Sequence, residues 1–162
     1  MAFNKVSNER LSELYAKGET SGQASNMFIR EDTVYSYGEH FKIAVRLTQM
    51  EKFSTNVEHV FNSKTYSNST SQQQSKVRSN LRSYIELPDC DYSEKTLRAY
   101  VDELKAEVKE IQAQQDKLRT KGKRFAQLQN KIVNAAARAK EVEMFTVSLY
   151  GGNAIHFIKE AA

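Results

Sequence analysis

Residues 97–139, LRAYVDELKAEVKEIQAQQDKLRTKGKRFAQLQNKIVNAAARA, decide the fold of the second half of the chain. Apolar side chains recur there at alternating spacings of four and three residues, beginning with Leu97, Val101 and Leu104 and ending with Ile132 and Ala139. A heptad pattern sustained over about six repeats is typical of long helices that pack along a seam. The stretch therefore predicts long helices rather than strands.

The seam is weakest near Gly122, because Gln115, Gly122 and Gln129 occupy successive seam positions. Glycine in a helix interior costs about 1 kcal/mol relative to alanine, and the flanking Lys121 and Lys123 favour a turn. We therefore predict a helical hairpin that bends near Gly122 within a monomer. An unbroken helix that pairs antiparallel in a dimer is the alternative, and the sequence does not separate the two.

Charge is distributed unevenly around this bend, although the formal net charge of the chain is only +4. Residues 91–116 carry four Lys/Arg and seven Asp/Glu, whereas residues 117–140 carry eight Lys/Arg and no acidic residue. The basic segment can contact phosphates, or it can fold back to pair with Glu103, Glu107 and Glu110. The residues that would bind a nucleic acid or another partner are Lys117, Arg119, Lys121, Lys123, Arg124, Lys131 and Arg138.

In the first half of the chain, short segments with the apolar spacing of helices alternate with segments that have the apolar spacing of strands. A helix is expected from Ser7 to Lys17 with Gly18 at its end, and residues 27–37 alternate as a hairpin around Glu31-Asp32-Thr33. Residues 40–47, HFKIAVRL, predict a third strand and residues 53–61 a fourth. A helix is expected from Ser69, with Val77, Leu81, Tyr84 and Ile85 as its apolar stripe.

These elements predict an α+β protein in which a small antiparallel β-meander with packed helices precedes a long helical hairpin or coiled coil. The expected parts are an α+β domain over residues 1–90, the hairpin over 91–143 and a β-like tail over 144–162. In the tail we expect strands at Phe145 to Tyr150 and at Ile155 to Ile158, separated by Gly151-Gly152.

Composition excludes several classes of protein. No apolar run approaches the roughly 20 residues that cross a bilayer, and the first residues lack the pattern of a secretory signal, so we expect a cytoplasmic chain without a membrane partner. One cysteine and three histidines, without the spacing of a zinc site, predict no disulfide, no metal and no cofactor.

The sequence offers no catalytic residues, and we expect no enzymatic activity. It contains no nucleophile elbow, Walker A, dinucleotide-binding or zinc-protease motif. Asp89 and Glu86 lie near the only cysteine, Cys90, and this acidic surrounding should raise the pKa of the thiol.

A cluster of hydroxyl, imidazole and guanidinium groups is the other candidate site. If the helix that opens at Ser69 packs beside the second strand, its N-terminus and these side chains could hold an anion such as phosphate, or could be structural. The candidate residues are Tyr35, Tyr37, His40, Tyr66, Thr70, Ser71 and Arg78.

The same region carries the patterns YSYGxHFxIA, YSxxTS and SxVR between Tyr35 and Arg78. It resembles a small domain family of unknown function found in bacteriophage and prophage proteins. The resemblance implies a phage setting and a unit of β-meander plus helix. We therefore expect a phage-encoded, non-enzymatic accessory protein, in its most specific form an inhibitor of a bacterial defence complex, that binds a host or phage macromolecule. A nucleic-acid-binding protein using residues 117–140 is the alternative, and an anion- or nucleotide-binding domain is a third.

Overall fold

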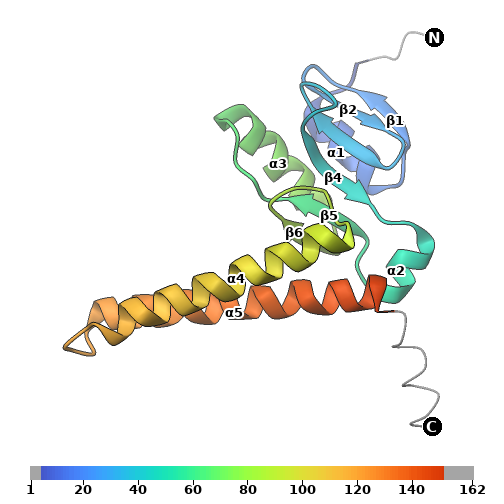
Figure 1. Ribbon diagram of the computed structural model, residues 1–162. Helices are drawn as coiled ribbons and strands as arrows, with labels where there is room; N and C mark the ends of the chain where they lie inside the picture. Colours follow the sequence, from blue (N-terminus) through green and yellow to red (C-terminus); the bar gives the residue numbers. More distant parts are fainter. Residues whose placement is uncertain (1–4, 152–162) are drawn as a thin grey trace. The chain divides into compact units, whose positions relative to one another are not determined.

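The computed structural model describes residues 5–151 of the chain, which divides into two compact units, Met1–Tyr92 and Ser93–Ala162. The first unit contains one six-stranded sheet with the order β1-β2-β3-β4-β5-β6 (Figure 1). All neighbouring strands are antiparallel except β5 and β6, which are parallel. The mixed α+β class expected from the sequence is confirmed. The strands are β1 Ser21–Gln23, β2 Met27–Arg30, β3 Thr33–Ser36, β4 Lys42–Arg46, β5 His59–Asn62 and β6 Tyr84–Leu87.

Helix α1, Asn8–Ala16, begins and ends where its sequence predicts. The Oγ atom of Ser7 accepts a hydrogen bond from the backbone N–H of Arg10 at 3.1 Å and so caps the first turn. At the other end Gly18 has a φ of +101°, and its N–H donates to the carbonyl of Tyr15 at 3.0 Å. Together with the bond from the Glu19 N–H to the Leu14 carbonyl, this is a Schellman motif that requires glycine.

The hairpin of β2 and β3 turns at Glu31 and Asp32, as expected, with Glu31 at a φ of +54°. The expected strand at 53–61 is largely wrong. Thr48 and Glu51 form a capping box that starts a short helix, α2 Gln49–Thr55, and Asn56 ends it in the left-handed conformation. Phe53, whose apolar side chain suggested a strand, lies on this helix with 89% of its surface exposed.

Helix α3, Asn68–Asn80, connects β5 to β6 and makes their pairing parallel. Its cap is Ser67 rather than Ser69, because the Ser67 Oγ accepts from the Thr70 N–H at 3.2 Å. The apolar stripe expected to continue through Tyr84 and Ile85 is also wrong, since Leu81 is extended and these two residues belong to β6. The spacing of Tyr84 and Ile85 is compatible with a helix or with a strand, and their pairing with β5 makes this segment a strand.

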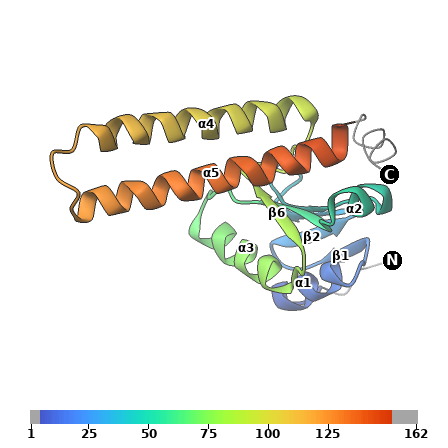
Figure 2. The same cartoon turned by 90° about the horizontal axis from the view of Figure 1, so that it is seen from below.

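Helices α1 and α3 lie side by side and contact the sheet through β2 and β4 (Figure 2). The core between the helices and the sheet contains fully buried side chains from α1, β3, β4, β5 and α3: Leu11, Tyr15, Val34, Ile43, Phe61 and Val77. Gln73 is buried in α3 as well, and its Oε1 atom has no hydrogen-bond partner within residues 5–151.

The second unit is a helical hairpin of α4, Glu94–Asp116, and α5, Lys123–Tyr150, which run antiparallel beside each other (Figures 1 and 2). Gln115 links the two helices near the turn, because its Nε2 atom donates to the Gln129 Oε1 at 2.9 Å and to the Phe125 carbonyl at 3.3 Å. The predicted bend at Gly122 within one chain is confirmed. Gly122 has an ordinary φ of −91° and open space where a Cβ would stand.

Two expectations about this hairpin are corrected. The buried seam of α5 runs through Leu128, Ile132, Ala135, Ala139 and Val142 instead of Phe125, Gln129 and Ala136, because the non-helical turn resets the heptad phase. Residues 145–150 are the last turns of α5 rather than a strand, and Phe145 continues the buried seam. The expected strand at 155–158 lies outside the described residues.

Candidate nucleic-acid interface

The turn between α4 and α5 is anchored by apolar packing at the end of the hairpin. Leu118, half-buried, packs on a small core of Ile111, Leu128 and Ile132. Its N–H donates to the Gln115 carbonyl at 3.0 Å, which closes the last turn of α4. The turn thus has a defined conformation and presents its remaining side chains outward.

Five of those outward residues are cationic, and we call them the basic tip. All five are exposed, and no acidic residue occurs between positions 117 and 140. Within residues 5–151 none of them forms an ion pair, and the Lys121 Nζ lies 5.9 Å from the ring centroid of Phe125. Five like charges within eight residues repel one another, which favours an anionic partner. The basic tip comprises Lys117, Arg119, Lys121, Lys123 and Arg124.

The pairing of basic residues 117–140 with the acidic face of α4 is not found in the part of the chain that the structure describes. Glu103, Glu107 and Glu110 are exposed on α4 and form no ion pair with the basic segment. The ion pair that joins the two helices has the opposite sense, with the Lys105 Nζ of α4 at 3.0 Å from the Glu143 Oε1 of α5. The charges of the tip therefore remain uncompensated by α4.

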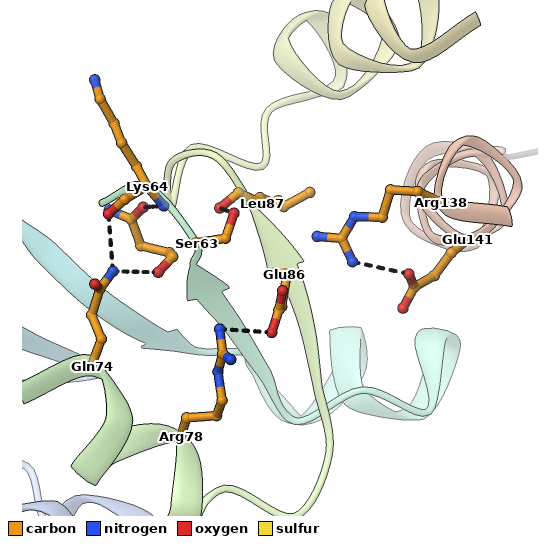
Figure 3. Close-up of polar contacts among 9 residues, drawn as sticks. Ser63, Lys64, Gln74, Arg78, Glu86, Leu87, Arg138 and Glu141 are labelled. Atoms are coloured by element: carbon orange, nitrogen blue, oxygen red, sulfur yellow. Dashed lines mark hydrogen bonds and ion pairs between the residues drawn. The ribbon is translucent and has the colours of Figure 1, made fainter. Parts of the chain in front are cut away.

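Four cations, Lys117, Arg124, Lys131 and Arg138, recur every seven residues in the sequence and would form a basic stripe along one continuous helix, but the bend divides them. Lys117 caps the end of α4 and is not on α5, so only Arg124, Lys131 and Arg138 keep the helical repeat of roughly 10.5 Å. Arg124 and Lys131 are exposed, whereas Arg138 donates to the Glu141 Oε2 at 3.1 Å (Figure 3). The cations are therefore concentrated at the tip instead of along one flank.

No hydrogen bond joins the tyrosine and histidine members of the predicted anion cluster to one another within residues 5–151. Tyr35 stacks on Phe28 across β2 and β3, with ring centroids 4.9 Å apart. Tyr37 follows β3 with a φ of +58° and is 57% exposed, and His40 is exposed in the next turn. Tyr66 is exposed and its ring lies 5.9 Å from that of Phe41.

The α3 members of that cluster have structural partners. Thr70 is buried at the helix start with its Oγ1 atom 2.9 Å from the Ser67 Oγ, and Ser71 is half-buried behind it. Arg78 lies ten residues after Asn68, roughly 15 Å along the helix, and so is far from the N-terminus. Its guanidinium pairs with Glu86 at 2.9 Å (Figure 3). The same guanidinium lies over the ring of Phe61, with its carbon 4.8 Å from the ring centroid. Arg78 and the start of α3 therefore do not belong to one site.

Two further titratable groups are buried in the first unit, and only one of them was identified from the sequence. Burial, and then the charge of Asp89, raises the pKa of the Cys90 thiol to about 12, which confirms the expected direction. His59 was not singled out, because a single histidine in a strand carries no motif. It is 3% exposed in β5 and lines a large pocket of the first unit.

Comparison with known protein families, curated proteins and solved structures finds no match to this chain. The resemblance of residues 35–78 to a phage domain family therefore stays a prediction. Among the described residues, no helix is both long enough and apolar enough to span a membrane.

Proposed function

We propose that this chain is a non-enzymatic binding protein whose basic tip contacts the phosphate backbone of a nucleic acid. The observation that carries the proposal is the concentration of five exposed cations in the eight residues from Lys117 to Arg124, none of which forms an ion pair with residues 5–151. Uncompensated Lys and Arg side chains on one small surface are the electrostatic signature of phosphate binding.

The shape of the hairpin supports this use of the tip. Helix α4 has 23 residues and so places the turn roughly 34 Å from the start of the helix at Glu94. The small core of Ile111, Leu128 and Ile132 keeps the turn folded at that distance. A narrow helical end with cations on it can enter a groove or a channel that a flat surface cannot.

Recognition would be independent of base sequence. Between positions 117 and 140 the one aromatic residue is Phe125, which is half-buried and has the Lys121 Nζ 5.9 Å from its ring centroid, so the tip has no series of exposed rings on which bases could stack. Contacts by Lys and Arg to phosphates fix position on a nucleic acid but do not read its sequence. In the phage setting expected from the sequence, such a tip would serve an inhibitor that occupies the nucleic-acid channel of a bacterial defence complex.

Fluorescence anisotropy with a labelled DNA duplex tests the proposal. A triple variant, Arg119→Gln, Lys121→Gln and Lys123→Gln, removes three tip cations. Each phosphate contact adds roughly 0.9 to log K at 0.1 M salt, so the variant should bind two to three orders of magnitude more weakly.

The matched control removes the same charge from exposed lysines elsewhere, with Lys5→Gln, Lys64→Gln and Lys95→Gln. We expect the control to retain most of the wild-type affinity. If both variants weakened binding equally, the net charge of the protein rather than the basic tip would account for the affinity. If the wild-type protein did not bind the duplex, the proposal would be refuted and an acidic protein partner would be the alternative.

A further inference from the structure

The first unit contains a pocket of about 830 Å³ that the proposed function does not use. Its walls come from the end of α1, the turn between β2 and β3, the end of β4, the start of α2, the start of β5 and the segment after α3. A volume within the range of about 300 to 1,000 Å³ is typical of sites for small molecules. Inner residues of this pocket are Arg46 and His59.

His59 is the first indication of a ligand. Neither its Nδ1 nor its Nε2 atom has a hydrogen-bond partner within residues 5–151, although the residue is 3% exposed. Burial lowers the pKa of this imidazole to about 4, so the ring is neutral at pH 7; the Ser83 carbonyl, which lies near the ring without forming a hydrogen bond of normal geometry, offsets the effect only in part. A neutral imidazole has one donor and one acceptor, and leaving both unpaired in a buried place is unfavourable.

Arg46 lies directly beside His59. The two residues are opposite each other in the register of β4 and β5, and directly opposed residues of antiparallel strands project to the same face. Tyr15 packs against both, with the Arg46 guanidinium carbon 4.8 Å from its ring centroid and the His59 ring 5.5 Å away. A cation and a neutral donor thus stand side by side on one wall.

Arg46 is held rigidly and still has donors to offer. Its Nη2 atom donates to the carbonyl of Tyr15 at 2.6 Å and to that of Glu19 at 3.2 Å, which uses both protons of that atom. The Nη1 atom is 3.6 Å from the Asp32 Oδ1, too far for a good hydrogen bond. The Nη1 and Nε protons therefore have no close acceptor in the described part of the chain.

The charge of the pocket changes from its inner wall to its rim. The Arg46 side chain is 11% exposed, whereas that of Asp32 is 59% exposed, so the more deeply buried member of this pair is the cation. Three further cations, Lys17, Lys52 and Arg82, line the pocket, and so do two further acids, Glu13 and Glu58. An anionic group would therefore be attracted to the inner wall, and polar groups of either sign could be accommodated at the rim.

We propose that this pocket binds a small organic anion whose carboxylate or phosphate group accepts hydrogen bonds from Arg46 and His59. The oxyanion would accept from the N–H of the neutral imidazole and from one free edge of the guanidinium, through either the Nη1 protons or the Nε proton, which point in different directions. A bare phosphate is far smaller than the pocket, so the remaining volume would hold an organic body against the polar rim.

Nitrogen-15 spectra of the histidine rings in the full chain test this proposal. The probes are inorganic phosphate, adenosine 5′-monophosphate and succinate, each added at millimolar concentration against sodium chloride of equal ionic strength. We expect the His59 ring signals to move and saturate with at least one of them, while exposed His40 does not respond. A response to phosphate and the nucleotide alone would assign a phosphate group, and one to succinate alone a carboxylate.

Two variants locate the effect, and Lys64→Gln serves as a charge-matched control. Arg46→Lys should weaken binding about tenfold or more, because it removes charge-assisted hydrogen bonds. Lys52→Gln is at the rim and should weaken it about two- to fivefold, a loss that does not depend on how well Arg46→Lys folds. No saturable movement of the His59 signals with any probe, or equal affinity in Lys52→Gln and Lys64→Gln, would overturn the proposal.

Discussion

Replacement of Arg46 by methionine should destabilise the first unit by about 3 kcal/mol. Methionine keeps most of the alkyl chain but removes the two hydrogen bonds from Nη2 to the carbonyls of Tyr15 and Glu19 and the contact with the Tyr15 ring. Hydrogen bonds from charged groups contribute about 1.5 to 3 kcal/mol each, and a desolvated cation–π contact about 1 to 2 kcal/mol.

The net loss is smaller than the sum of these contributions. The Tyr15 carbonyl still accepts from the Gly18 N–H at 3.0 Å, and the Glu19 residue is exposed to water, so neither acceptor becomes buried without a partner. The ion pair with exposed Asp32 adds less than about 1 kcal/mol. Arg46→Lys keeps the positive charge and can still donate to one of the two carbonyls, so its loss in free energy of unfolding should be about half that of Arg46→Met.

Urea denaturation followed by tyrosine fluorescence measures this loss, since six of the eight tyrosines lie within residues 1–92. The midpoint should decrease while the m-value stays constant. Arg30→Met is the control, because Arg30 is an exposed cation paired with exposed Glu39, and its loss should cost under about 0.5 kcal/mol. An Arg46→Met protein as stable as this control would refute the assigned role of Arg46.

Further variants test other parts of the structure. His59 takes up a proton near pH 6.5 in the unfolded chain but only near pH 4 in the folded protein. The free energy of unfolding should therefore fall by up to about 3 kcal/mol as the pH decreases from 6.5 to 4. In denaturation measured at several pH values, His59→Phe should remove this dependence. Cys90 should react with a thiol reagent such as DTNB no faster than the protein unfolds, because its buried thiol has a pKa of about 12, and rapid labelling of the native protein would contradict this. Gly18→Ala should lower the free energy of unfolding by about 1 kcal/mol because it forces alanine to a φ of +101°, whereas Gly122→Ala should change it by less than about 0.5 kcal/mol, in thermal or urea denaturation. Ile111→Ala should lower the free energy of opening the end of the hairpin by about 2 to 4 kcal/mol. Hydrogen exchange should then show faster exchange of amides in the turn and unchanged exchange in the sheet.

Local signals in the sequence were sufficient wherever one pattern had no competitor. Ser7 and Gly18 delimit α1 because a cap and a left-handed glycine act on their immediate neighbours. The heptads and Gly122 predicted the hairpin, since residues four and three apart must share a helix face. The candidate tip was visible for the same reason, as a run of cations in a predicted turn.

The remaining elements depend on contacts between distant residues. Tyr84 and Ile85 are compatible with helix or strand, and their pairing with β5 decides the outcome. Phe53 suggested a strand, but the capping box that starts at Thr48 places it on a helix. The division of the basic stripe followed from the turn, whose non-helical residues shift the phase of everything after it.

The pocket could not be predicted because it depends on strand register. Arg46 and His59 are thirteen positions apart in the sequence and become neighbours only when β4 pairs with β5 in the observed register. The strand predicted at 53–61 had no such register, so nothing connected the imidazole with the guanidinium. A histidine at the start of an apolar strand was the one available signal.

The salt dependence of duplex binding tests the central claim, that the basic tip contacts phosphates, most directly. Anisotropy titrations of the wild-type protein should be measured from about 50 to 200 mM salt. Five phosphate contacts predict a slope of about −4.5 in a plot of log K against log salt concentration, and a loss of affinity of roughly 500-fold over this range. In the Arg119→Gln, Lys121→Gln and Lys123→Gln variant the slope should fall to about −2. A wild-type slope near zero, or a variant slope equal to that of the wild-type protein, would contradict the account.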